Sequence, residues 1–237
     1  MPLWAVEGKV IFFAHVPKTG GLSMGEYLAR RIGPPTIGGI SRVGTGLIVP
    51  PIHFSAADLK IFLPSAVDYC FAMVRDPIAR LTSEFRFQAG RSRTTRLGFS
   101  NWLRIMLKAA RRDPRVYENH LRPQTDMVPD GAEVFRFEDG FEPVIRRLDA
   151  VLGNRRTDLA MPHVNQGLPG TIEMYRQDIE LAETFYAADY TRFGYPLSDE
   201  SGLDSDPYSG VRATLASMLA PMLVARERRR WVRLPAP

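Results

Sequence analysis

Two short apolar runs, each followed by a helical pattern, dominate the first ninety residues. The runs at 9–15 and 69–74 are rich in β-branched and aromatic residues, which is typical of strands buried on both faces. After each run, apolar residues recur at helical spacing, over 24–32 after the first and over 78–85 after the second. The pattern therefore predicts a strand–loop–helix module that occurs twice.

The alternation continues through the middle of the chain. Helices are predicted at about 99–111, 141–152 and 172–188, with a short strand at 133–137 between them. The segment 33–51 is rich in Gly and Pro without a sustained period, which indicates a long surface loop near a site. Strands that alternate with helices favour an α/β fold, a parallel sheet flanked by helices.

The domain organisation is predicted from the lack of linkers and repeats in the sequence. Because no low-complexity linker or internal repeat divides the sequence, we expect a single domain over 1–237, with a core at about 9–196. A C-terminal helical extension is expected at about 207–237. Within it, 211–230 predicts an amphipathic helix that is interrupted at Pro221 and ends in a basic run.

Charge and cysteine content narrow the function classes only in part. The chain of 237 residues has 31 Lys and Arg against 26 Asp and Glu, a formal charge of +5, which favours polyanionic partners without choosing among them. One cysteine, Cys70, excludes an intrachain disulfide and fits a reducing compartment. With no signal-peptide pattern at the start and no apolar stretch of bilayer-spanning length, the sequence predicts a cytoplasmic protein.

The junction after the first strand carries the most informative residues, Pro17-Lys18-Thr19-Gly20-Gly21-Leu22-Ser23. A helix N-terminus binds anions, because its unpaired N–H groups point outward and glycines allow close backbone approach. Lys18 would add a mobile charge, and Thr19 and Ser23 would bond phosphate or cap the helix. The alternative is a tight turn beside a solvated lysine. In a Walker A loop the lysine follows the second glycine, whereas here Lys18 precedes the glycine pair. This order disfavours an ordinary ATP or GTP hydrolase.

The second junction, Arg75-Asp76-Pro77-Ile78-Ala79-Arg80-Leu81-Thr82-Ser83, has the same position after a strand. Pro77 is suited to the first helical position and Asp76 to the cap. Arg80 and Ser83 stand one turn apart, and with Arg75 they could bind a second phosphate. The alternative is a common helix start with solvated arginines.

Together the two junctions resemble the family of sulfotransferases that use 3′-phosphoadenosine 5′-phosphosulfate (PAPS), especially the carbohydrate branch of the heparan and chondroitin type. In that family the loop that resembles 17–23 holds the 5′-phosphosulfate, and the element that resembles 75–83 holds the 3′-phosphate. The family fold is a P-loop-like parallel sheet flanked by helices. One departure is Leu22, where family loops often have a hydroxyl residue, so a side-chain contact to the donor would be missing while the backbone N–H remains.

The resemblance extends to about Pro196 and implies the reactants. It runs, with decreasing specificity, through 120–124, 134–139, 162–165 and 185–195. It implies PAPS as donor, 3′-phosphoadenosine 5′-phosphate (PAP) as product and no required metal. The implied partner is an acceptor hydroxyl, with an anionic saccharide as a candidate, and no nucleic acid.

Sulfuryl transfer also needs a base and positive charge near the leaving oxygen. The chain has four histidines, His15, His53, His120 and His163. The resemblance selects His53 as base, where the glycan enzymes carry a histidine; a helix-flanking role is the alternative. Lys18 would stabilise the leaving nucleotide. His120 and Arg122 resemble the acceptor-side element and could orient an acidic sugar; a purely structural role is the alternative. His120 is the rival base, and Glu84 is a backup base.

These observations predict a nucleotide-binding transferase that moves a sulfuryl group from PAPS to a hydroxyl, on a saccharide, by in-line transfer. Two alternatives stay open. One is a catalytically silent protein that binds nucleotides or polyanions, and the other, less favoured, is an ATP-dependent kinase of P-loop type.

Overall fold

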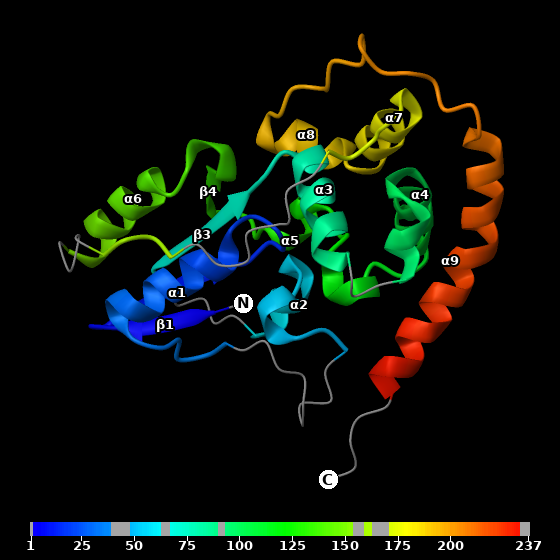
Figure 1. Cartoon of the computed structure of the whole chain (residues 1–237). Helices are drawn as coiled ribbons and strands as arrows, with labels where there is room; N and C mark the ends of the chain where they lie inside the picture. The colour runs from blue at the N-terminus through cyan, green and yellow to red at the C-terminus, as the bar shows by residue number, and fades with distance from the viewer. Residues whose placement is uncertain are drawn as a thin grey trace. The chain divides into compact units, whose positions relative to one another are not determined.

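The computed structural model describes residues 2–38, 48–62, 67–89, 93–153, 159–162 and 171–232. The chain forms two compact units (Figure 1). Unit 1 comprises Met1–Arg42, Val49–Arg75 and Asp126–Gln166, and unit 2 comprises Val43–Ile48, Asp76–Thr125 and Gly167–Pro237. The segments of the two units interleave along the chain instead of following one another as successive domains. The expected limits of the core and of the C-terminal extension stay predictions.

Unit 1 is built on a sheet that, within the described residues, has four strands in the order β1-β2-β3-β4. Strands β2 and β3 pair in parallel, as do β3 and β4, whereas β1 pairs antiparallel with β2. The strands are β1 (Leu3–Val6), β2 (Lys9–Ala14), β3 (Tyr69–Val74) and β4 (Glu133–Arg136). The α/β class with a mostly parallel sheet, and the three predicted strands, are confirmed.

Strand β1 was not among the predicted elements. It is joined to β2 by a two-residue turn, in which Glu7 and Gly8 have φ of 48° and 75°. Positive φ at both central residues is the geometry whose twist matches that of paired antiparallel strands. The turn therefore folds β1 back onto β2, and Trp4, 2% exposed, is buried as a result.

One face of the sheet holds the core of unit 1. Helices α1 (Gly21–Ile32) and α6 (Glu142–Leu152) supply Leu28 and Leu148 to the cluster that contains Phe13 of β2 and Phe71 of β3. The two phenylalanines are register partners and their rings stack 4.8 Å apart. Burial of each such side chain contributes about 1.5–3 kcal/mol, so this packing fixes where the ends of β2 and β3 lie.

Unit 1 also has shorter elements outside the sheet. They are η1 (Pro51–His53), α2 (Ala56–Phe62) and η4 (Phe137–Asp139). The predicted loop 33–51 falls partly outside the described residues. Its described start passes beside β1, because Leu3 donates its N–H to the carbonyl of Ile37 at 2.7 Å.

Unit 2 is helical. Its elements are α3 (Pro77–Gln88), η2 (Arg93–Leu97), α4 (Phe99–Arg112), η3 (Val116–Asn119), α7 (Arg176–Phe185), α8 (Ala187–Phe193) and α9 (Ser209–Val232), and α5 (Gln124–Met127) spans the boundary between the units. Helix α9 packs along α4 (Figure 1). The predicted helices at 99–111 and 141–152 are confirmed. The one predicted at 172–188 begins later, because the Asp178 carboxylate accepts the Tyr175 N–H at 3.0 Å and fixes the helix start. It also ends earlier, at Phe185, and α8 begins as a separate helix after Tyr186.

The predicted interruption at Pro221 is wrong, because α9 is continuous from Ser209 to Val232. A proline inside a helix removes one hydrogen bond, and its ring crowds the preceding turn. Here Ala220, Leu223 and Val224 are buried on either side of it. Their packing outweighs the local cost. Within the described residues, no helix is long and apolar enough to cross a membrane.

Asp113 joins the end of α4 to the end of α9. Its side chain is 1% exposed and accepts hydrogen bonds from Arg115 at 2.9 Å and from Arg228 at 3.0 Å. Burial alone would raise the pKa of this carboxyl, but the hydrogen bonds from Arg115 and Arg228 hold it below its ordinary value. The two arginines therefore stabilise the ionised form of Asp113.

We expect Asp113→Asn to lower the stability of the protein at pH 7 by about 1–2 kcal/mol, because both arginines are half exposed, and the Tm by about 3–6 °C. A carboxyl group whose pKa is lower in the folded state than in the unfolded state stabilises the fold at pH values above its unfolded pKa. This stabilisation is lost as the pH falls through the folded pKa. The difference in Tm should therefore shrink below about pH 4. Thermal melts across pH test this, with the exposed Asp204→Asn as control. A difference that is constant down to pH 3 would contradict it.

Candidate functional site

The loop from His15 to Gly20 connects β2 to the first turn of α1. Gly20 is the N-cap with φ of 79°, and Lys18 also has a left-handed backbone with φ of 70°. Thr19 is buried, and its hydroxyl donates to the Val16 carbonyl at 2.9 Å. Within the described residues no side chain caps α1, so its first N–H groups suit an anion.

The other predicted loop residues differ in exposure. Pro17, Gly21 and Ser23 are buried, Lys18 and Gly20 are half-buried, and Leu22 is 41% exposed on the first turn of α1. The exposed leucine cannot supply a hydroxyl, as expected from the sequence. Whatever binds at this helix end meets backbone from Gly20 to Ser23 more than side chains.

Both glycines of the loop are required by close packing. A Cβ on Gly21 would lie 2.6–2.9 Å from three atoms of the His15 ring. A Cβ on Gly20 would lie 2.8 Å from Phe141 and 2.9 Å from Phe137, in a backbone conformation that already favours glycine. The loop is therefore pressed against its own unit and has little room to move.

His53 lies beside this loop. It ends η1, and its ring centroid is 5.4 Å from that of His15, the residue on which Gly21 packs. His15 is 3% exposed, whereas His53 is half-buried. The structure thus brings the predicted base next to the predicted phosphate loop, with His15 as the structural residue between them.

Arg75 follows β3 and also reaches the loop. Its Nη1 is 3.4 Å from the Lys18 carbonyl, and its guanidinium lies 4.6 Å from the centre of the Phe137 ring. The carboxyl ends of neighbouring parallel strands are where α/β folds bind ligands. Lys18 after β2 and Arg75 after β3 stand at such neighbouring ends, so the Arg75 guanidinium approaches the backbone of the loop that carries Lys18.

In unit 2, α3 starts as the sequence predicts, with Pro77 in the first turn and the Asp76 carboxylate accepting the Ala79 N–H at 2.7 Å. Ser83 is half-buried on α3. Arg80 is 1% exposed and donates to the carbonyls of His120 at 3.0 Å and Arg122 at 2.8 Å. The predicted contact of Arg80 with a phosphate stays a prediction, and what the structure assigns to it is support of the 120–122 backbone.

Tyr186 completes this support. It is buried, its hydroxyl donates to the Leu121 carbonyl at 2.8 Å, and its ring lies 5.2 Å from the Arg80 guanidinium. Burial raises the pKa of this phenol well above its ordinary value. Arg80 and Tyr186 therefore hold three successive carbonyls. The family resemblance includes Tyr186 but predicts no role for it.

His120 is held by a buried carboxylate. Its Nδ1 is 2.8 Å from Oε2 of Glu84, whose other oxygen accepts from Gln88 at 2.7 Å; Gln88 in turn accepts from Trp102 at 3.0 Å. Tyr117, Glu118 and Asn119, just before it, all have positive φ. Such conformations cost energy and cluster at functional sites. An oriented histidine next to strained backbone is consistent with an acceptor-side role.

The predicted residues thus fall into two groups. Unit 1 brings together the loop 17–23, His53 and Arg75, and unit 2 brings Arg80 together with His120 and Arg122. His163 lies outside the described residues. The sequence indicates both His15, as a residue packed beneath the loop, and Glu84, but their partners Gly21 and His120 follow only from the folded chain.

A mostly parallel sheet with a helix N-terminus after the carboxyl end of β2 is an architecture with which α/β proteins bind phosphate-bearing ligands. The model of the sulfotransferase family matches residues 2–196, which is most of the chain. The chain therefore belongs to the sulfotransferase family, and membership implies an enzyme that uses PAPS. Comparisons with curated proteins and with solved structures give no match.

Proposed function

We propose that this sulfotransferase moves the sulfuryl group of PAPS to a saccharide hydroxyl by in-line displacement, with His53 as base. The acceptor oxygen attacks sulfur, the bond from sulfur to the bridging oxygen breaks, His53 takes the acceptor proton, and PAP leaves with the electron pair. The observation that carries the proposal is that the Arg75 guanidinium and the His15–His53 pair both lie against the loop that carries Lys18.

The two ends of the donor are assigned to the two junctions. The loop 17–23 binds the 5′-phosphosulfate through backbone N–H groups, and Lys18 stabilises the charge that develops on the departing phosphate. Arg75, Arg80 and Ser83 bind the 3′-phosphate. Arg80 contributes through N–H groups other than those bonded to carbonyls, because a guanidinium has five. No metal is needed for this chemistry.

The acceptor side is assigned to His120 and Arg122. The carboxylate of Glu84 orients the His120 ring, and Arg80 with Tyr186 fixes the backbone from which both side chains project. A histidine and an arginine at fixed positions suit an anionic saccharide. The enzyme acts in the cytoplasm under this proposal.

The donor assignment is tested by calorimetry with PAP and with ATP and magnesium. We expect PAP to bind the protein at least tenfold more tightly, because only PAP has a 3′-phosphate, and one charge-assisted hydrogen bond is worth about 1.5–3 kcal/mol. Arg75→Met should remove most of that preference. The control is Arg146→Met, which removes the same charge from an exposed position of unit 1.

The outcomes separate the three functions. Equal affinity for PAP and ATP, unchanged by Arg75→Met, would contradict the donor assignment. Tight ATP binding that requires magnesium would favour a kinase. PAP binding without transfer to any saccharide, lipid or small alcohol would favour the silent binding protein.

A further inference from the structure

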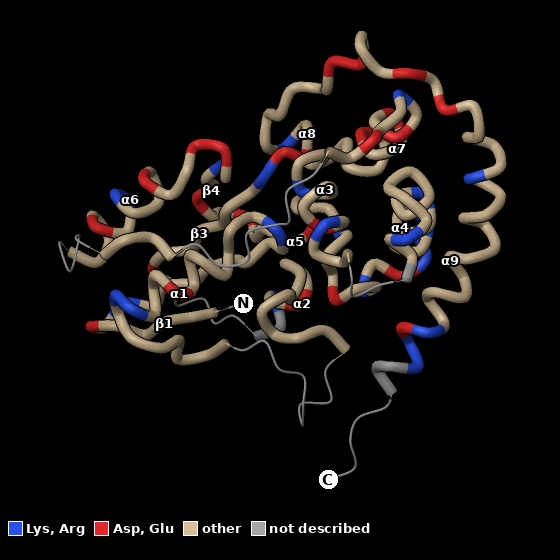
Figure 2. The backbone as a smooth tube through the Cα atoms, viewed as in Figure 1, with Lys and Arg blue, Asp and Glu red and all other residues tan. Residues whose placement is uncertain are grey.

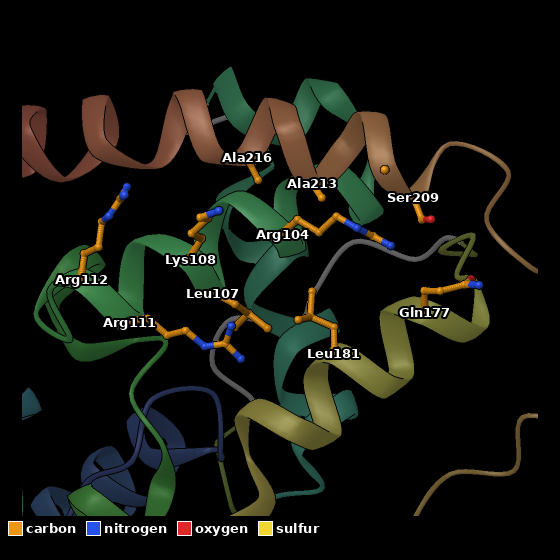
Figure 3. A pocket seen from close by; sticks show the side chains of 11 residues that line it. Arg104, Leu107, Lys108, Arg111, Arg112, Gln177, Leu181, Ser209, Ala213 and Ala216 are labelled. Atoms are coloured by element: carbon orange, nitrogen blue, oxygen red, sulfur yellow. The ribbon is translucent and has the colours of Figure 1, made fainter.

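A cavity of about 620 Å³ lies within unit 2, between α4, α7 and the first turns of α9 (Figure 3). Its volume is in the range of about 300–1,000 Å³ typical of small-molecule sites. None of the residues assigned above to donor or acceptor lines it. One wall is α9, which lies beyond the residues 2–196 that the family model matches. The cavity is therefore a feature that the family function does not account for.

The charge of the lining is one-sided. Helix α4 contributes Arg104, Lys108, Arg111 and Arg112, and the described lining contains no acidic residue. The first three follow the spacing i, i+4 and i+7, so they share one face of α4. Figure 2 shows these basic positions along α4.

Arg104 is already neutralised. Its guanidinium pairs with Asp178 and, at 3.2 Å, with Asp206, and all three side chains are buried. Arg212 adds a second cation to Asp206 at 3.1 Å. This network holds the start of α9 against α4 and α7, so Arg104 forms a fixed wall of the cavity and adds little free charge.

The other three cations keep donors for an anion. Lys108 donates to the Ser217 hydroxyl, which uses one of three ammonium hydrogens. Arg111 lies with its guanidinium 5.5 Å from the centre of the Phe185 ring, a contact of its face and not of its N–H groups. Arg112 is exposed at the end of α4, and its side chain points toward α9, away from that of Arg111 (Figure 3).

The rest of the lining is largely apolar. Leu107 and Leu181 face the cavity from α4 and α7, and Ala213 and Ala216 face it from α9 (Figure 3). The small alanine side chains leave the space that larger residues would fill. A ligand that matches both the apolar and the basic part of the lining has an apolar body beside the leucines and alanines and an acidic group beside Lys108 and Arg111.

We propose that this cavity binds a single-chain amphiphile with an acidic head group, of the fatty-acid class. The head group bonds to Lys108 and Arg111, and Arg112 adds long-range attraction. The chain lies between Leu107, Leu181 and the alanines of α9. The inference rests on unit 2 alone and does not depend on the donor or the acceptor.

Calorimetry on the full chain tests the proposal with three probes. Octanoate carries both the chain and the charge, octanol only the chain, and acetate only the charge. We expect octanoate to bind at one site and the other two at least about tenfold more weakly, because each lacks one half of the match. Equal binding of octanol and octanoate, or no binding of octanoate, would overturn the proposal.

Two variants locate the binding. Lys108→Met removes the central charge, and Ala213→Phe fills the space without changing charge; each should weaken octanoate binding about tenfold or more. Arg226→Met is the control, since it removes a charge from an exposed position of α9 outside the lining. Unaltered circular dichroism spectra and Tm show that the variants fold. Octanoate binding that survives both substitutions, or that falls equally in Arg226→Met, would place the ligand elsewhere and refute the assignment.

Discussion

Lys18→Met is expected to lower the turnover number of sulfuryl transfer by about 10²–10³-fold, the usual cost of removing one donor that stabilises developing charge. The charge on the departing phosphate is greatest in the transition state, so kcat should fall more than KM for the donor rises. Methionine is a fair substitute, because its unbranched side chain keeps the length of the lysine stem. Steady-state kinetics with PAPS measures the effect.

Lys60→Met supplies the comparison for this variant. Lys60 is exposed on α2 of the same unit, so its substitution removes the same net charge without touching the loop. Its kinetics should match those of the unaltered enzyme. If the two variants behave alike, or if Lys18→Met changes only KM, then Lys18 does not act on the leaving group.

His53→Ala is expected to reduce turnover by about 10²-fold or more while PAP binding is retained, because a general base acts on the acceptor proton and not on the nucleotide. His53 lies beside His15 and not within the loop, so its truncation leaves the packing of Gly21 on His15 in place. Turnover and PAP calorimetry on the same preparation separate the two effects.

His120→Gln tests the rival histidine. Glutamine can keep a hydrogen bond to Glu84, so the fold of unit 2 should survive the change. Under the present assignment this variant raises KM for the acceptor more than it lowers kcat. Unchanged turnover in His53→Ala together with a collapse of kcat in His120→Gln would transfer the role of base to His120.

Much of the fold could be predicted because its main elements have unambiguous local signals. The runs that form β2 and β3 are apolar on both faces, and Gly33 and Pro77 mark where helices end and begin. Strand β1 was missed because it has four residues and becomes a strand only by pairing with β2. At Pro221 the local rule favoured a break, and the tertiary packing of α9 outweighed it.

The candidate site also has one part that local sequence predicts and one part that depends on long-range contacts. The loop 17–23 and the start of α3 could be located, because a phosphate-binding junction depends on residues adjacent in sequence. The partners of Arg80 could not, since the carbonyls of His120 and Arg122 lie about forty residues away along the chain. An arginine that reads as a phosphate ligand in the sequence is, in the folded chain, also a buried support, and only long-range contacts reveal this.

The interleaving of the two units bears on how the nascent protein folds. Unit 1 has all its described strands and helices once α6 has been synthesised, but unit 2 lacks the helix that packs along α4 until α9 emerges. Before then the face of α4 that α9 will cover lacks its packing partner, and incompletely packed chains are prone to aggregate. Ribosome-bound intermediates that end before Ser209 are therefore the ones expected to need chaperones.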